Sequence, residues 1–276
     1  MPYALSDLRD SVGTITLNHP EKCNALSRAL IEEIIAALGA FNKQTTRVVI
    51  LRAAEGTKVW SAGHDVSELP PAHHDPLGWD DPLRQLIRAI DGFPSPVIAM
   101  VEGGVWGGAC ELAFACDLVV AARNATFAIT PAKLGVPYNL TGLLTFMSAV
   151  SLHIVKELAF TAQPIAAERA ERLGIINHVV PREDLERFTY DLASQIILNS
   201  PLSISVMKEE FNILANAHDL PPLMFERIQG LRRRVYNSDD YREGIQAFLE
   251  KRKPNFKGRS RKANIGDEAP GTMTPR

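Results

Sequence analysis

Hydrophobic positions follow two patterns in the first half of the chain and mainly one in the second half. Short apolar runs typical of buried strands occur at 12–17, 47–52, 96–101 and 118–122. Apolar residues at helical spacing fill 27–41, where Ser27 is a suitable N-cap, and a further helix is expected to begin at Gly107. Strands that alternate with helices in this way predict an α/β core.

From about residue 143 onward the pattern is almost entirely helical. The expected helices span 143–160, 166–173, 182–199, 201–217, 221–236 and 239–250. We therefore expect a core over residues 1–195, a helical region over 196–258 and a disordered tail over 259–276, which is basic and then rich in Gly, Pro and Thr. The segment 70–82 combines prolines with His73 and His74, and it is interpreted as a loop or a lid.

Composition narrows the classes of protein that fit. The 276 residues are 46% hydrophobic, so the chain can bury a sizeable core, and its net charge of −2 gives no reason to expect nucleic acid or a membrane as a partner. The N-terminus carries early acidic residues and no apolar stretch, so it does not resemble a signal peptide. Three cysteines without metal-ligand spacing favour free thiols and a cytoplasmic location.

Two glycine-containing segments carry the candidate chemistry. Segment 101–117 places two Gly-Gly pairs between an apolar strand and a helix, and segment 59–68 places Ser61, Ala62 and Gly63 after an earlier strand. Glycine lets the backbone approach a ligand closely, and the first N–H groups of a helix have no partner within it. Such N–H groups suit an anion, or an oxygen that becomes an anion during a reaction. Either segment alone is also compatible with a tight structural turn.

Taken together and in this order, the two segments resemble the crotonase (enoyl-CoA hydratase/isomerase) superfamily, and the resemblance extends over residues 5–258. It implies an α/β, crotonase-like spiral of β-β-α units, with a C-terminal helical trimerisation region that builds a homotrimer or a dimer of trimers. It also implies an acyl-CoA thioester as substrate, bound by an oxyanion hole made of the backbone N–H groups of His64 and Gly108. CoA enters as part of the substrate, and no cofactor or metal is expected.

The same resemblance assigns contacts with the acyl-CoA to the segment 18–27, to the two turns and to single residues elsewhere. Lys22 is expected at the CoA phosphates and Lys251 at the adenine end, in many members from a neighbouring subunit. The full set of expected substrate-binding residues is Lys22, Ala25, Ala62, Gly63, His64, Asp65, Val66, Gly108, Thr130 and Lys251.

The carboxylates distinguish reactions within the superfamily. A hydratase needs two, and Glu111 fits the first, but the second position, four residues before Gly135, holds Pro131. This departure disfavours water addition. The segment 134–140, which carries Tyr138, instead resembles members that decarboxylate methylmalonyl-CoA to propionyl-CoA and CO2 through a thioester enolate.

The expected catalytic residues are His64, Gly108, Tyr138 and Glu111. Tyr138 would hold the substrate carboxylate out of the thioester plane, and the His64 ring would assist. Two of these residues also have structural interpretations, since Tyr138 could be a core tyrosine and Glu111 a retained residue held in hydrogen bonds. Two other functions stay open, an enoyl-CoA hydratase or isomerase and a non-catalytic acyl-CoA-binding protein. Pro131 disfavours the first, and the complete pair of glycine turns disfavours the second.

Overall fold

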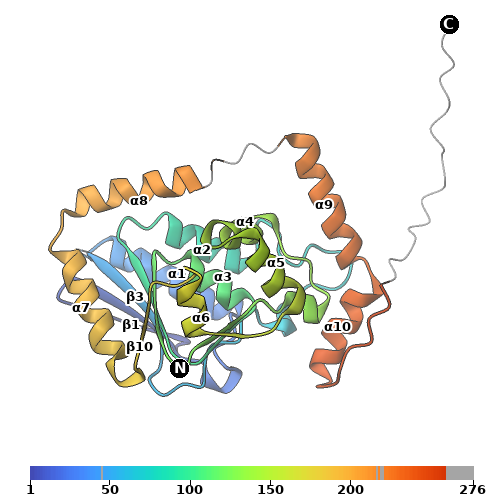
Figure 1. The fold of residues 1–276 in the computed structure, drawn as a ribbon, viewed down its shortest axis with the longest axis horizontal. Helices are drawn as coiled ribbons and strands as arrows, with labels where there is room; N and C mark the ends of the chain where they lie inside the picture. The colour runs from blue at the N-terminus through green and yellow to red at the C-terminus, as the bar shows by residue number, and fades with distance from the viewer. Residues whose placement is uncertain (45, 216, 218–220, 259–276) are drawn as a thin grey trace, which may run out of the picture.

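A computed structural model describes residues 1–44, 46–215, 217 and 221–258, and its centre is a six-stranded sheet (Figure 1). The strand order is β1-β2-β3-β5-β7-β10, with β1 antiparallel to β2 and the other neighbouring pairs parallel. The strands are β1 (Ala4–Arg9), β2 (Val12–Leu17), β3 (Val48–Ala53), β5 (Val97–Val101), β7 (Leu118–Ala122) and β10 (His178–Val180). Every residue of β5 is buried, as its continuous apolar run predicts.

The structure also contains a smaller, four-stranded sheet, in which the strands again follow one another in chain order. It pairs β4 (Val59–Ser61), β6 (Gly104–Trp106), β8 (Thr126–Ala128) and β9 (Ile165–Ala166). Along the chain, a strand of the large sheet is followed by a strand of the small sheet and then by a helix. This order occurs in β3-β4-α2, β5-β6-α3 and β7-β8-α4, where α2 is Pro82–Asp91, α3 is Gly108–Ala115 and α4 is Leu140–Ala149. The repeated β-β-α unit confirms the expected spiral.

The main core lies between the sheets and the helices of the spiral. It includes buried side chains of α1 (Arg28–Asn42), α2 and α3, together with the indole of Trp60. A second apolar cluster covers the other face of the large sheet, where α7 (Leu185–Ile197) packs. Helix α7 ends at Ile197, so the predicted division at residue 195 falls within its last turn.

The remaining helices are α5 (Leu152–Thr161), α6 (Ala167–Arg172), α8 (Pro201–Ala215), α9 (Pro222–Tyr236) and α10 (Asp239–Leu249). In Figure 1, α8, α9 and α10 lie at the periphery of the molecule. Within the described ranges, no helix has the length and apolar content that crossing a membrane requires. The tail predicted at 259–276 lies outside the described residues, as does residue 216 near the end of the helix predicted at 201–217.

Three expectations for individual elements were wrong. The single helix predicted at 143–160 is two helices, α4 and α5, because Val150 adopts an extended conformation and Ser151 begins a new helix. The almost wholly helical second half contains β9 and β10, strands of two and three residues that are too short for an alternating pattern. Helix α2 was missed, although Asp81 caps it and Pro82 occupies its first turn, which are typical signals of a helix start.

Candidate active site

The first turn of the site presents the backbone N–H of His64. Gly63 precedes it with φ +85°, a left-handed conformation that favours glycine. The carbonyl of Gly63 accepts a hydrogen bond from Leu26 N at 2.8 Å, and Asp65 N lies 3.5 Å from the carbonyl of Leu26. These two bonds hold the residues on either side of His64, and no described residue accepts the His64 N–H.

The segment 18–27, which is expected to contact the acyl-CoA, is hydrogen-bonded to this turn. Asn24 is almost fully buried, and its side chain donates to the carbonyl of Trp60 at 3.0 Å and accepts from His19 N at 2.8 Å. Ser61 donates its hydroxyl to the carbonyl of Asn24 at 2.7 Å and accepts from Gly63 N at 3.2 Å. The loop and the turn therefore form one hydrogen-bonded unit.

The second turn presents the N–H of Gly108, the first residue of α3. Gly107 precedes it with φ +56°, and its own N–H donates to the carbonyl of Ala128 at 2.8 Å. A Cβ on Gly107 would lie 2.9 Å from the hydroxyl oxygen of Thr130, so the Thr130 side chain lies against this turn. Because Gly108 begins the helix, its N–H has no acceptor within α3.

The two turns approach each other more closely than any side chain would allow. A Cβ on Gly63 would lie 2.3 Å from the carbonyl oxygen of Trp106 and 2.9 Å from the nitrogen of Gly108. A Cβ on Gly108 would in turn lie 3.5 Å from the nitrogen of His64. The two N–H groups are therefore neighbours, and one oxygen atom could accept from both.

Tyr138 lies beside the second turn. Its hydroxyl donates to the carbonyl of Gly107 over a long 3.5 Å, and its ring packs edge-on against Phe146 with centroids 5.2 Å apart. Burial raises the pKa of Tyr138, so the phenol stays protonated at neutral pH and can donate a hydrogen bond. The backbone carbonyl of Tyr138 accepts from Arg232 Nε at 3.1 Å, which fixes the residue from α9.

Glu111 projects from α3 into the same region, but its carboxylate is paired. It is 1% exposed and forms an ion pair with Arg84 of α2. Gly142 of α4 gives this carboxylate room, because a Cβ there would lie 2.8 Å from Glu111 Oε1 and 2.7 Å from the Tyr138 ring. Pro131 begins a short 3-10 helix, η3 (Pro131–Leu134), and offers no ionisable group at the position of the second carboxylate.

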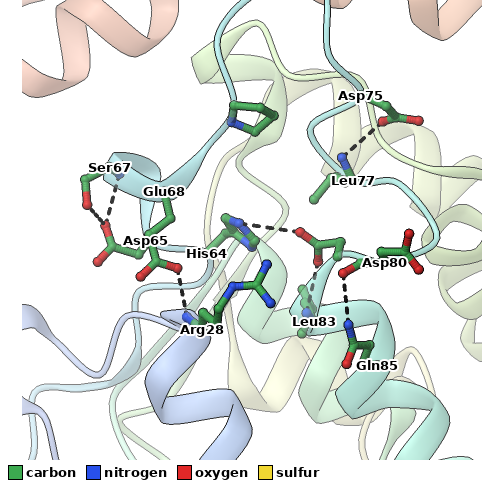
Figure 2. Close-up of polar contacts among 12 residues, drawn as sticks. Arg28, His64, Asp65, Ser67, Glu68, Asp75, Leu77, Asp80, Leu83 and Gln85 are labelled. Carbon is green, nitrogen blue, oxygen red and sulfur yellow. Dashed lines mark hydrogen bonds and ion pairs between the residues drawn. The ribbon is translucent and has the colours of Figure 1, made fainter.

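The imidazole of His64 faces a carboxylate on one side. Its Nε2 lies 3.7 Å from Asp81 Oδ2, the contact marked beside His64 in Figure 2. Its Nδ1 is buried and has no hydrogen-bond partner among the described residues. Burial raises the pKa of Asp81, an effect that attraction to His64 opposes in part.

The other expected substrate-binding residues lie in or next to the first turn. Ala25 and Ala62 lie in the bonded unit described above, Asp65 accepts from Ser67 N at 3.0 Å as the N-cap of η2 (Val66–Glu68), and Val66 is buried. Lys22 lies 3.2 Å from Asp65 Oδ2 with its side chain largely exposed. Burial opposes ionisation of Asp65, but hydrogen bonds from Ser67 and the contact with Lys22 outweigh it and lower the pKa.

Lys251 is the expected residue that the structure does not bring to the turns. It follows α10, is exposed, and donates its backbone N–H to the carbonyl of Phe248.

Sequence reasoning missed three residues that shape the site: Asp81, Arg84 and Arg232. Arg84 carried a signal, because it lies among the apolar residues that α2 buries, and a buried guanidinium requires an acidic partner. Arg232 carried no comparable signal, although it makes two bonds to Asp75 at 2.7 and 2.5 Å and so ties α9 to the segment 70–82. Across the described ranges, no group of three or more His, Cys, Asp or Glu residues is arranged to hold a metal ion.

The spiral fold and the paired N–H donors define a class of acyl-CoA proteins, and the sequence agrees with it. Residues 7–259 match the family described as enoyl-CoA hydratase/isomerase. The chain belongs to this family.

Particular relatives narrow the comparison. The chain is 53% identical to the methylmalonyl-CoA decarboxylase of Escherichia coli K12 over 249 residues, which cover 90% of this chain and 95% of that protein. A solved methylmalonyl-CoA decarboxylase in complex with 2-nitronate-propionyl-CoA superposes with a TM-score of 0.92 at 52% identity, covering 93% of this chain and 99% of that one. Another, complexed with 2S-carboxypropyl-CoA, gives a TM-score of 0.92 at 51% identity and covers 94% and 99%.

Proposed function

We propose that this chain decarboxylates methylmalonyl-CoA to propionyl-CoA and CO2, the substrate and reaction named for its Escherichia coli relative. One observation carries the proposal. The site has two neighbouring backbone donors, but neither of the two carboxylate positions that water addition uses holds a free carboxylate. Pro131 occupies the second carboxylate position, and Glu111 is bound to Arg84. A hydratase would need both groups, whereas loss of CO2 needs neither.

The two turns supply the main catalytic effect. As the bond between C2 and the carboxylate breaks, its electron pair moves into the thioester carbonyl and forms an enolate. The N–H groups of His64 and Gly108 donate to the oxygen on which this charge develops, and each donor contributes about 2.7–4 kcal/mol in comparable oxyanion holes. CO2 leaves without a proton transfer, so this step requires no general base. One proton then adds to C2 of the enolate and completes propionyl-CoA.

The side chains around the turns orient the substrate carboxylate. The breaking bond must stand perpendicular to the thioester plane, so that its electrons enter the carbonyl system. The single proton of the Tyr138 hydroxyl points to the Gly107 carbonyl over 3.5 Å. When substrate binds, this hydroxyl donates instead to the carboxylate and holds it in this position. The His64 side chain, which is 14% exposed, assists this positioning.

Residues around these turns bind the rest of the substrate. Lys22 binds the CoA phosphates, Thr130 contacts the acyl end, and Lys251 reaches the adenine end from a neighbouring subunit. The small side chains of Ala25 and Ala62 and the segment Gly63–Val66 form the surface along which the CoA arm lies.

Comparison of two substrates tests the proposed reaction. The chain should release CO2 from methylmalonyl-CoA faster than it adds water to crotonyl-CoA, because the oxyanion donors are present and the hydratase carboxylates are not free. Mass spectrometry of both products from one preparation measures the two rates. Hydration that is faster than CO2 release would contradict the proposal and favour the hydratase alternative, and turnover of neither would favour a binding protein.

The Tyr138→Phe variant tests the orientation step. Losing one hydrogen bond to a charged group typically costs about 1.5–3 kcal/mol, so kcat/KM for CO2 release should fall roughly tenfold to a hundredfold. The affinity for propionyl-CoA, which has no carboxylate, should change little. Tyr190→Phe is the matched control, since it removes a hydroxyl bonded to Thr14 at 2.8 Å on the far side of the large sheet. Normal CO2 release by folded Tyr138→Phe would remove Tyr138 from the mechanism.

We further propose that the chain forms a homo-oligomer built on trimers. Large apolar side chains are exposed along the peripheral helices, including Leu202, Phe211 and Leu214 of α8 and Leu223 of α9, which a second copy could cover. Light scattering at micromolar concentration should give three or six times the 30.4 kDa of one chain. A mass of one chain under these conditions would contradict this part of the proposal.

The free thiols of Cys23, Cys110 and Cys116 support a cytoplasmic location.

A further inference from the structure

The ion pair between Arg84 and Glu111 is one of the most deeply buried charge pairs in the described structure. The Arg84 side chain is 8% exposed and that of Glu111 is 1% exposed, and they join the facing helices α2 and α3. Buried charges are costly unless they are paired, and a buried pair often stabilises a fold no better than apolar residues of the same size. Stability alone is therefore a weak reason for this pair.

The pair lies directly behind the reacting end of the site. Leu83, the residue before Arg84, lies within 2.8 Å of the position that a Cβ on Gly108 would occupy. Glu111 lies one helical turn after Gly108. Glu111 Oε1 and the Tyr138 ring also meet at Gly142, where both lie within 2.8 Å of one Cβ position. The pair therefore lies close to the two backbone donors and to the phenol, so its net charge acts on the groups that surround the acyl end.

A substrate with a carboxylate on its acyl group is sensitive to that charge. An unpaired Glu111 would place a second carboxylate next to it, and neighbouring carboxylates disfavour each other's ionised forms. Arg84 cancels this charge at its source. The other charged groups near the pair are Asp81, which faces His64, together with Arg88 and Asp91 on α2.

We propose that Arg84 is a specificity-determining residue: by neutralising Glu111, it allows the acyl pocket to accept an acyl group that carries a carboxylate. The inference rests on the proposed function for the choice of acyl group. It assigns Glu111 no proton transfer, and it gives the pair one role, which is to set the net charge behind the pocket. Selectivity for a carboxylated over a neutral acyl group should then follow the charge of the pair and not the identity of its side chains.

Four proteins test this relation: the parent, Arg84→Met, Glu111→Gln and the double variant. With every remaining carboxylate counted as ionised, the formal charge of the pair is neutral in the parent and the double variant, negative in Arg84→Met and positive in Glu111→Gln. The probes are S-(2-carboxypropyl)-CoA and S-propyl-CoA, thioethers that differ only in the carboxylate and cannot be decarboxylated. Calorimetry gives both Kd values, and their ratio gives the selectivity for the carboxylate.

The expected ratios follow the charge series. Selectivity for the carboxylated probe should fall at least about tenfold in Arg84→Met, because a neighbouring like charge commonly shifts a carboxylate equilibrium by about one pKa unit or more. It should rise in Glu111→Gln and return to within about threefold of the parent in the double variant, because the double variant again has no net charge at the pair. The Kd of S-propyl-CoA should stay within about threefold throughout.

Two results would overturn the inference. Equal selectivity in all four folded proteins, or equal loss of both probes in each single variant, would make the pair purely structural. If Arg84→Met does not fold, Glu111→Gln and the double variant still decide, because selectivity must rise in the first and return in the second. The ratio involves no turnover, so absence of CO2 release by the parent would refute the proposed function without resembling either of these results.

Discussion

The close contact between two glycine turns is the constraint on which the rest of the site depends. The backbone at Gly63 approaches the Trp106 carbonyl and the Gly108 nitrogen to distances that a Cβ would violate. Parallel pairing of β4 with β6 brings the two turns to one edge of the small sheet, and the bonds from Leu26 and Asn24 hold the first turn in place. Main-chain donors fixed in this way need no reorganisation when charge develops on a bound oxygen.

Around these donors, the side chains control where negative charge can lie. Pro131 removes one carboxylate position, Arg84 engages Glu111, and Asp81 faces the ring of His64 while it caps α2. Arg232 donates to the backbone carbonyl of Tyr138 and also binds Asp75. The peripheral helix α9 and the segment 70–82 therefore both support the residue that we propose holds the substrate carboxylate.

Local signals predicted much of this arrangement, and contacts between distant residues account for what was missed. The two glycine turns are local features of the sequence, whereas the assignment of the His64 and Gly108 N–H groups as donors and the β-β-α spiral followed from the family resemblance. Arg84 and Glu111 are 27 positions apart, and Arg232 lies 94 positions from Tyr138, so only the folded chain shows that they meet. Strand β10 has three residues and is defined by its pairing with β7, which no local pattern records.

If the N–H groups of His64 and Gly108 donate to one oxygen, they polarise the carbonyl of a bound thioester. Isotope-edited infrared spectroscopy of propionyl-CoA labelled with ¹³C at the thioester carbon measures this directly, because stronger hydrogen bonding lowers the carbonyl stretching frequency. The account predicts a lower frequency in the complex than in water, and loss of that shift in Gly63→Ala, whose Cβ would separate the two turns. A bound carbonyl that absorbs at or above its frequency in water would contradict the account.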